Sequence, residues 1–276
     1  MADASGLSQK RELKMAQYQD HMLILKSRPY READILLTLF GIKSGKIGAV
    51  AKGARRPKSR LAGVYPLSYV ICQIYHGRSS LDTLNGVDLV DGFPGLQKDL
   101  SRLSWALLLA DLVDEMFSER DPAPEVVPWI IAAWDRVAGE GPGLTTALSA
   151  GWQLLKLAGY IPQWETCHIC GEIPVQNSVG VDWEHDVMYC SRHLPVRSQG
   201  ASEGMAVSLG SLRTWQRWMT LDVTKLGNYE AKGIIGEELF FVFGQYIERH
   251  IGRMPRSWQF VREVENIAGK ERNRLF

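Results

Sequence analysis

Residues 66–75 have the sequence Pro-Leu-Ser-Tyr-Val-Ile-Cys-Gln-Ile-Tyr. In an extended chain successive side chains point to opposite faces, so Val70, Cys72 and Ile74 share one face while Tyr69 lies on the other. This alternation of period two, bounded by proline and by a glycine-containing turn, predicts a β-strand with one buried face.

Four further apolar segments of strand length accompany this one, at residues 22–25, 33–40, 46–51 and 81–90. Five short strands within roughly 70 residues predict a small barrel or sandwich, and the oligonucleotide-binding (OB) fold is a five-stranded barrel. We therefore expect an α+β multidomain protein that begins with an OB-fold β-barrel.

After Phe93-Pro94-Gly95 the apolar spacing becomes helical, with Leu100, Leu103 and Leu107 on one face. Further helices are expected at residues 125–137, 144–158, 209–219 and 229–251. The predicted organisation is a flexible tail (1–20), the barrel (21–95), the first part of a helical domain (96–165), a zinc-binding insert (166–204) and the rest of the helical domain (205–276).

The charge is distributed unevenly, although the formal net charge of the 276 residues is only +1. Residues 1–80 carry 14 Lys and Arg against 5 Asp and Glu, whereas residues 81–165 carry 5 against 13. No acidic residue lies between Asp34 and Asp82. A barrel with such an excess of cations is typical of a domain that binds a polyanion.

Five cations fall in the segment 52–60, between two predicted strands: Lys52, Arg55, Arg56, Lys58 and Arg60. A basic loop on a barrel can neutralise phosphates, which favours nucleic-acid binding that weakens with salt. Two alternatives remain open, a solvated loop and a loop that pairs with the acidic helices of residues 81–165. The aromatic residues nearby could stack on bases or belong to the barrel core: Tyr30, Phe40, Tyr65, Tyr69 and Tyr75.

Cys167 and Cys170 have the spacing C-x2-C, and Cys190 and His193 follow as C-x2-H. Two such turns bring four soft ligands to one tetrahedral Zn2+, and a full ligand set predicts a structural site, one per chain. A redox C-x2-C pair and metal-free packed thiols are the alternatives. His168 and His185 are less favoured ligands than His193, and Cys72 is expected in the barrel core.

Several classes of protein are disfavoured. No run of about 18 apolar residues is present, and residues 1–20 lack a secretory apolar region, so a reducing cytoplasm is expected. Residues 41–46 are one residue short of a phosphate-binding loop and lack its Ser or Thr. The carboxylates of Asp111, Asp114 and Glu115 are expected on a solvated helix face rather than in a catalytic pair.

Particular segments resemble the RecO family of bacterial recombination mediators. The resemblance is carried by residues 24–34 (ILKSRPYREAD), 45–61 (GKIGAVAKGARRPKSRL), 77–84 (GRSSLDTL) and 93–96 (FPGL). It is specific over residues 22–105 and continues as the order of domains, with RMPRS at 253–257 also similar.

The resemblance implies an OB barrel, a helical domain with a zinc-finger-like insert, and a non-enzymatic role in the RecFOR pathway of DNA repair in the cytoplasm, at the nucleoid. It implies binding of single- and double-stranded DNA, strand annealing, contacts with RecR and with the C-terminal tail of single-stranded DNA-binding protein, and RecA loading. The expected phosphate contacts are Arg28, Arg31, Lys46, Lys52, Arg55, Arg56, Lys58 and Arg60. His193 stands where many relatives have Cys.

Two other functions are weighed against this one. An OB-fold and zinc-ribbon module that binds RNA or serves transcription would share the basic loop and the cysteine pattern, and only the resemblance disfavours it. A nuclease would need carboxylates near the basic segment, and residues 35–81 contain none.

Overall fold

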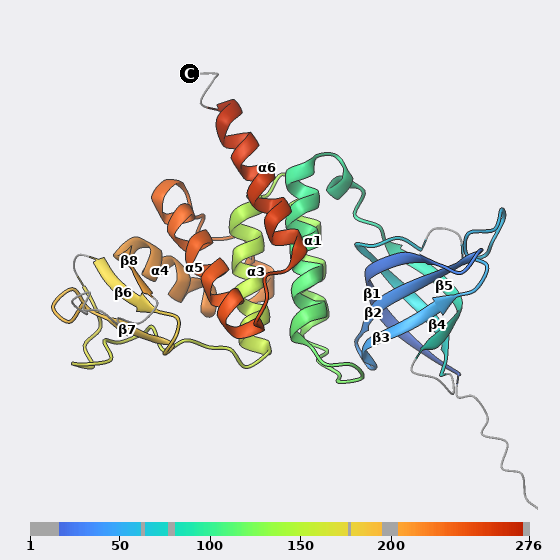
Figure 1. Cartoon of the computed structure of the whole chain (residues 1–276), viewed down its shortest axis with the longest axis horizontal. Helices are drawn as coiled ribbons and strands as arrows, with labels where there is room; N and C mark the ends of the chain where they lie inside the picture. The colour runs from blue at the N-terminus through green and yellow to red at the C-terminus, as the bar shows by residue number, and fades with distance from the viewer. Residues whose placement is uncertain (1–16, 62–63, 77–80, 176–177, 195–203, 273–276) are drawn as a thin grey trace, which may run out of the picture.

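A closed five-stranded barrel forms the N-terminal part of the computed structural model, as the strand pattern predicts (Figure 1). The structure describes residues 17–61, 64–76, 81–175, 178–194 and 204–272, without the side chains of 266–272. The strands are β1 (Gln17–Tyr30), β2 (Asp34–Gly41), β3 (Gly45–Ala51), β4 (Ser68–Tyr75) and β5 (Asp82–Asp91). Their order around the barrel is β1-β2-β3-β5-β4, in which only β3 and β5 pair in parallel.

Strand β1 is long enough to pair on both sides in turn. Residues 17–24 pair with β4 and residues 22–30 with β2, and the register shifts between Ile24 and Lys26. Such an irregularity bends a strand and lets a short sheet close on itself. Because β1 begins at Gln17, the expected tail of residues 1–20 is wrong for residues 17–20; residues 1–16 lie outside the described part.

The barrel interior is a core of its own, and it confirms the alternation of residues 66–75. Val70, Cys72 and Ile74 are buried with Met22, Ile24 and other apolar side chains of the five strands. Burial raises the pKa of Cys72 to about 12, so this thiol stays protonated at neutral pH.

The helical domain follows, with six α-helices in its described residues: α1 (Leu100–Met116), α2 (Val126–Ala138), α3 (Gly143–Leu157), α4 (Leu209–Met219), α5 (Gly233–Ile251) and α6 (Arg256–Arg272). Two short 3-10 helices lie between β5 and α1 (Pro94–Gln97) and between α4 and α5 (Val223–Lys225). Trp152 on α3 lies at the centre of an aromatic cluster with Trp164, Trp215 and Phe243. None of these helices has the length and apolar character needed to cross a bilayer.

The insert between α3 and α4 contains a three-stranded sheet ordered β7-β6-β8. Its strands are β6 (Ser178–Asp182), β7 (Val187–Tyr189) and β8 (Gly204–Ser208). Strand β8 was not predicted, and it carries the insert's sheet past the expected boundary at residue 204, because it pairs with β6 across the whole length of that strand.

An apolar interface joins the barrel to the helical domain. The outer face of the barrel contributes Leu23, Leu25 and Phe40, which are buried in the same core cluster as helices α1–α3. Phe40 meets Phe117, just after α1, edge to face with ring centroids 5.6 Å apart. The two domains therefore share one continuous core.

Ion pairs surround this apolar contact, and they correct the expectation for the acidic face of α1. Lys26 Nζ lies 2.8 Å from both Asp111 Oδ1 and Asp114 Oδ2, and Lys46 also pairs with Asp114. Arg253 pairs with Glu115. These carboxylates are not a solvated face, because the barrel and the α5–α6 connection supply their cations.

The segment after α1 also closes the barrel at its seam between β3 and β5. The Arg120 N–H donates to the Lys46 carbonyl (2.8 Å), and the Arg120 guanidinium lies 3.1 Å from the buried carboxylate of Asp82. Asp82 also accepts from Tyr18 and contacts His76. Although burial alone would raise the pKa of Asp82, the hydrogen bonds from Arg120 and His76 outweigh it and lower that pKa.

We expect Arg120→Met to lower the free energy of unfolding by about 1–3 kcal/mol at pH 7, because it removes a donor from a buried carboxylate. The lowered pKa means that this stabilisation is complete above the unfolded pKa of about 4 and is lost as pH falls through the folded pKa. Urea unfolding at pH 7 and at decreasing pH should show the difference from wild type shrink in acid. Arg60→Met, at an exposed arginine, is the control, and an equal loss there would contradict the prediction.

Candidate nucleic-acid interface and metal centre

Two segments meet at the end of the barrel formed by the β1–β2 turn. The Arg55 N–H donates to the Ala33 carbonyl (3.0 Å), and the Gly53 N–H donates to Asp34 Oδ1 (2.8 Å). The Arg55 guanidinium donates to the carbonyl of Glu32 (3.2 Å). The turn at residues 31–33 and the connection that follows β3 are therefore held side by side.

Seven of the eight cations predicted to contact phosphate lie on the end of β1, on this turn or on the connection after β3, and all seven are exposed. They are Arg28, Arg31, Lys52, Arg55, Arg56, Lys58 and Arg60. No ion pair joins any of the seven to a carboxylate among the described residues. We call this group the basic end of the barrel, and its guanidinium and ammonium groups can each donate hydrogen bonds to a phosphate oxygen.

Lys46 differs from the expectation, because it does not lie at the basic end. It stands at the opposite end of β3, about 20 Å from Lys52 at the usual rise of a strand. Its ammonium contacts Asp114 and is only 14% exposed. The alternative that the cations pair with the acidic helices therefore holds for Lys46 and Lys26, but not for the basic loop.

The aromatic residues of the barrel divide into two groups. Phe40 is buried in the interdomain core, and Tyr69 packs against that core and bonds His21. Tyr30, Tyr65 and Tyr75 are half-buried and belong to neither core cluster. From the sequence, each of these aromatic residues could either stack on bases or belong to the core. The structure places Phe40 and Tyr69 at a core and the other three outside both cores.

The predicted metal ligands converge in the insert. Two turns are closed by the Gly171 N–H to the Cys167 carbonyl (2.8 Å) and the His193 N–H to the Cys190 carbonyl (2.9 Å). Gly171 has a φ of 71°, which favours glycine. The four ligand atoms, from Cys167, Cys170, Cys190 and His193, lie within 4.8 Å of one another.

These distances fit a tetrahedral metal. A zinc ion about 2.3 Å from each sulfur would separate two sulfurs by about 3.8 Å. The Cys170 and Cys190 sulfurs are 4.0 Å apart, and His193 Nδ1 lies 3.3 Å from Cys190 Sγ and 3.6 Å from Cys167 Sγ. His185 instead contacts Asp182, which leaves His193 as the histidine of the cluster.

The surroundings also favour the ligating form of Cys167. Burial raises the pKa of this thiol, but hydrogen bonds from the backbone of Cys190 and Cys170 outweigh burial and lower the pKa to about 6. A thiolate is the form that binds a metal. This cluster can therefore bind a metal ion.

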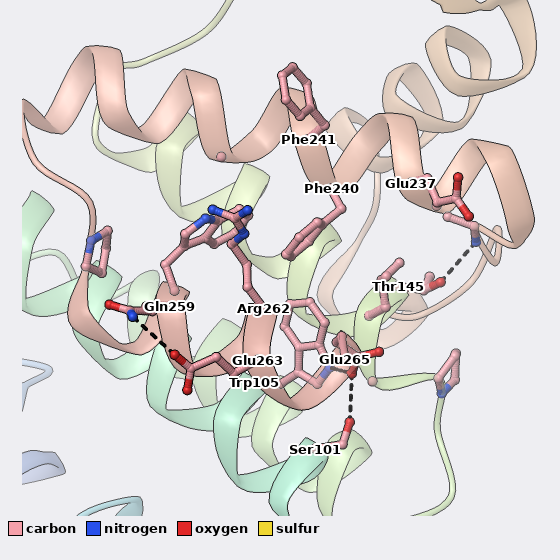
Figure 2. A pocket seen from close by; sticks show the side chains of 18 of the residues that line it. Ser101, Trp105, Thr145, Glu237, Phe240, Phe241, Gln259, Arg262, Glu263 and Glu265 are labelled. Carbon is pink, nitrogen blue, oxygen red and sulfur yellow. Dashed lines mark hydrogen bonds between the residues drawn. The ribbon is translucent and has the colours of Figure 1, made fainter. Parts of the chain in front are cut away.

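A groove of about 1880 Å³ lies between α5 and α6, and the start of α3 lines one end of it (Figure 2). Phe240 on α5 stacks on Trp258 of α6 with ring centroids 4.4 Å apart. Arg256 and Arg262 are exposed on the α6 wall and form no ion pair within the described residues. Glu265 at the base accepts from Ser101 and Trp105.

The sequence did not predict this groove. Its apolar residues and its arginines are ordinary for amphipathic helices, and the groove forms only where α5 and α6 come together in the fold. One signal was available: Gly244 on α5 allows the close approach of Trp258, because a Cβ there would lie 2.4 Å from the indole.

Comparisons with known proteins agree across both domains. The family model described as "Recombination protein O N terminal" matches residues 15–93. The family model described as "Recombination protein O C terminal" matches residues 97–259. A DNA repair protein RecO of Symbiobacterium thermophilum is 30% identical over 261 residues, covering 90% of this chain and 97% of that protein. A DNA repair protein RecO of Heliobacterium modesticaldum is 32% identical, with 93% of each chain covered.

A third DNA repair protein RecO, from Myxococcus xanthus, is 29% identical over 91% of this chain and 99% of its own length. Both family models correspond to the two domains described above, the barrel and the helical domain with its insert. The chain therefore belongs to the RecO family of DNA repair proteins.

Proposed function

We propose that this chain is a non-enzymatic recombination mediator that binds single- and double-stranded DNA and anneals complementary strands. The observation that carries the proposal is the basic end of the barrel, where seven exposed cations lie on the end of β1, the β1–β2 turn and the connection after β3, and hydrogen bonds hold the turn to that connection. Phosphates are common to both forms of DNA, so a surface of this kind binds either form with little dependence on sequence.

Annealing follows from the same surface. Two strands repel each other through their phosphates, and a cationic surface that holds both lowers this repulsion. Base pairing then supplies the free energy of the reaction, so no catalytic group is needed. The carboxylates of Asp111 and Asp114 are engaged by Lys26 and Lys46 at the domain interface, away from the basic end, which supports a role without nuclease chemistry.

The Cys167, Cys170, Cys190 and His193 cluster is proposed to hold one structural Zn2+. Four protein ligands leave no position for a reactive water, and the ion would stabilise the insert by joining two turns separated along the chain. The insert lies beyond the helices on the side away from the barrel (Figure 1), which fits a structural role.

The proposed partners are RecR and the C-terminal tail of single-stranded DNA-binding protein, and through them the protein assists RecA loading. The groove between α5 and α6 is our proposed site for that tail. Any C-terminal tail ends in a carboxylate. The exposed guanidinium groups of Arg256 and Arg262, which form no ion pair within the described residues, can bind one beside the stacked rings of Phe240 and Trp258.

Reversal of charge at Arg55, Arg56 and Lys58 to Glu should weaken DNA binding at least 100-fold and abolish most annealing, with the fold intact. Loss of three phosphate contacts should also reduce the slope of log affinity against log salt by about 2 for single strands. Fluorescence anisotropy over a salt series measures both. The matched control is reversal of Lys98, Arg217 and Lys225 in the helical domain, and equal binding by the loop variant and wild type would refute the proposed interface.

Replacement of Cys167 and Cys170 by Ser should remove zinc, about one ion per chain, and destabilise the insert and the helices around it. Metal analysis together with thermal unfolding tests this. His168→Gln should keep the metal, because His168 lies outside the cluster. Protein purified without chelator that contains no zinc would contradict the prediction.

Charge reversal of Arg256 and Arg262 to Glu should weaken binding of the tail peptide about tenfold or more, because each removes a charge-assisted contact. DNA affinity should stay within twofold of wild type. Calorimetric titration with the peptide measures the first effect, and reversal of Lys98 and Lys225 serves as control. Unchanged peptide affinity would place the tail elsewhere.

A further inference from the structure

The turn between β1 and β2 presents an aromatic ring beside the basic end. Tyr30 is the last residue of β1 and pairs with Asp34, so the turn between them is tight. Arg28, Pro29, Arg31 and Glu32 around it are exposed, and Tyr30 itself is half-buried.

The ring of Tyr30 is half-buried and is not part of either apolar core. Tyr18 packs against the barrel interior, and Phe40 and Tyr69 pack against the interdomain core, whereas Tyr65 and Tyr75 belong to neither. Tyr30 belongs to neither core, and its hydroxyl has no hydrogen-bond partner among the described residues. The ring is thus available to a ligand.

Arg31 is held next to this ring. Its Cζ lies 5.2 Å from the centroid of Tyr30, within the range of a cation–π contact. Arg31 has a φ of 51°, a left-handed conformation that is unfavourable for a residue with a Cβ. A strained conformation persists where surrounding contacts impose it, and such positions gather at binding sites.

The ring lies within reach of the phosphate-binding cations. The carbonyls of Glu32 and Ala33 accept from Arg55, so the basic loop is joined directly to this turn. A nucleotide whose base stacked on Tyr30 would have its phosphates beside Arg31 and Arg55. Base stacking on an aromatic ring is tolerant of sequence, because every base has a π face.

We propose that Tyr30 and Arg31 form a stacking platform for an unpaired base, which makes the basic end favour single-stranded over duplex DNA. The proposal rests on the DNA-binding function proposed above. Phosphates are present in both forms, but in a duplex each base is already stacked between its neighbours and cannot reach a ring outside the helix. The cations therefore supply affinity for both forms, and the platform distinguishes them.

Tyr30→Leu should lower the affinity for single-stranded DNA about tenfold, which corresponds to the loss of one stacked base. Affinity for duplex should stay within twofold, and the salt slope for single strands should not change, because no charge is lost. Tyr30→Phe should bind like wild type. Tyr75→Leu, at another half-buried tyrosine outside both cores, is the control. Anisotropy over a salt series measures all four proteins.

A single strand that contains 2-aminopurine gives a second readout, since stacking quenches the fluorescence of this base. Wild type and Tyr30→Phe should quench it, and Tyr30→Leu should not. Arg31→Lys keeps the charge but loses the planar guanidinium, so it should reduce the quenching.

Three results would overturn the platform: equal loss for single strands and duplex in Tyr30→Leu, a changed salt slope in that variant, or a Tyr30→Phe protein as weak as Tyr30→Leu. Failure of the platform is separable from failure of the proposed function. If reversal of Arg55, Arg56 and Lys58 weakens binding to both forms and Tyr30→Leu has no effect, only the platform is wrong. If neither variant has an effect, the DNA interface itself is wrong.

Discussion

The apolar contact between the outside of the barrel and helix α1 fixes the rest of the molecule. Leu23, Leu25 and Phe40 point away from the barrel interior, and they are buried only because the helical domain covers them. Removal of apolar area from water on this face makes the two domains one body. It also determines which end of the barrel faces the helices and which end is left to solvent.

This contact separates two groups of cations that the chain carries in the same 80 residues. Lys26 and Lys46 lie at the interface and are neutralised by Asp111 and Asp114. The seven cations of the basic end lie beyond the reach of α1 and keep their charge available. The excess positive charge of the barrel is therefore paired with the acidic residues of α1 at the domain interface. At the basic end of the barrel, the positive charges lie away from those acidic residues.

The acidic residues of α1 that bind the barrel also bind the residues that lead into α6, which forms one wall of the groove. One carboxylate oxygen of Asp111, Oδ1, pairs with Lys26 of the barrel. The other oxygen, Oδ2, accepts hydrogen bonds from the N–H and the hydroxyl of Ser257 at the start of α6. Arg253 pairs with Glu115 one turn further along α1. One face of α1 therefore positions both the barrel and the helix that forms a wall of the proposed partner site.

The sequence alone determined what depends on neighbours along the chain. Alternation in residues 66–75 predicted the barrel's inner face, and the C-x2-C and C-x2-H spacings predicted the four ligands, because a strand and a turn are set by local geometry. The tertiary structure decided which cations have no ion pair among the described residues, which tyrosines lie outside the cores, and where a groove opens. Lys46 and Lys52 are alike as residues in a basic segment, and only the packing of α1 against one end of the barrel gives the first an ion-pair partner and leaves the second exposed. Such differences follow from contacts between residues far apart in the chain, which no local pattern encodes.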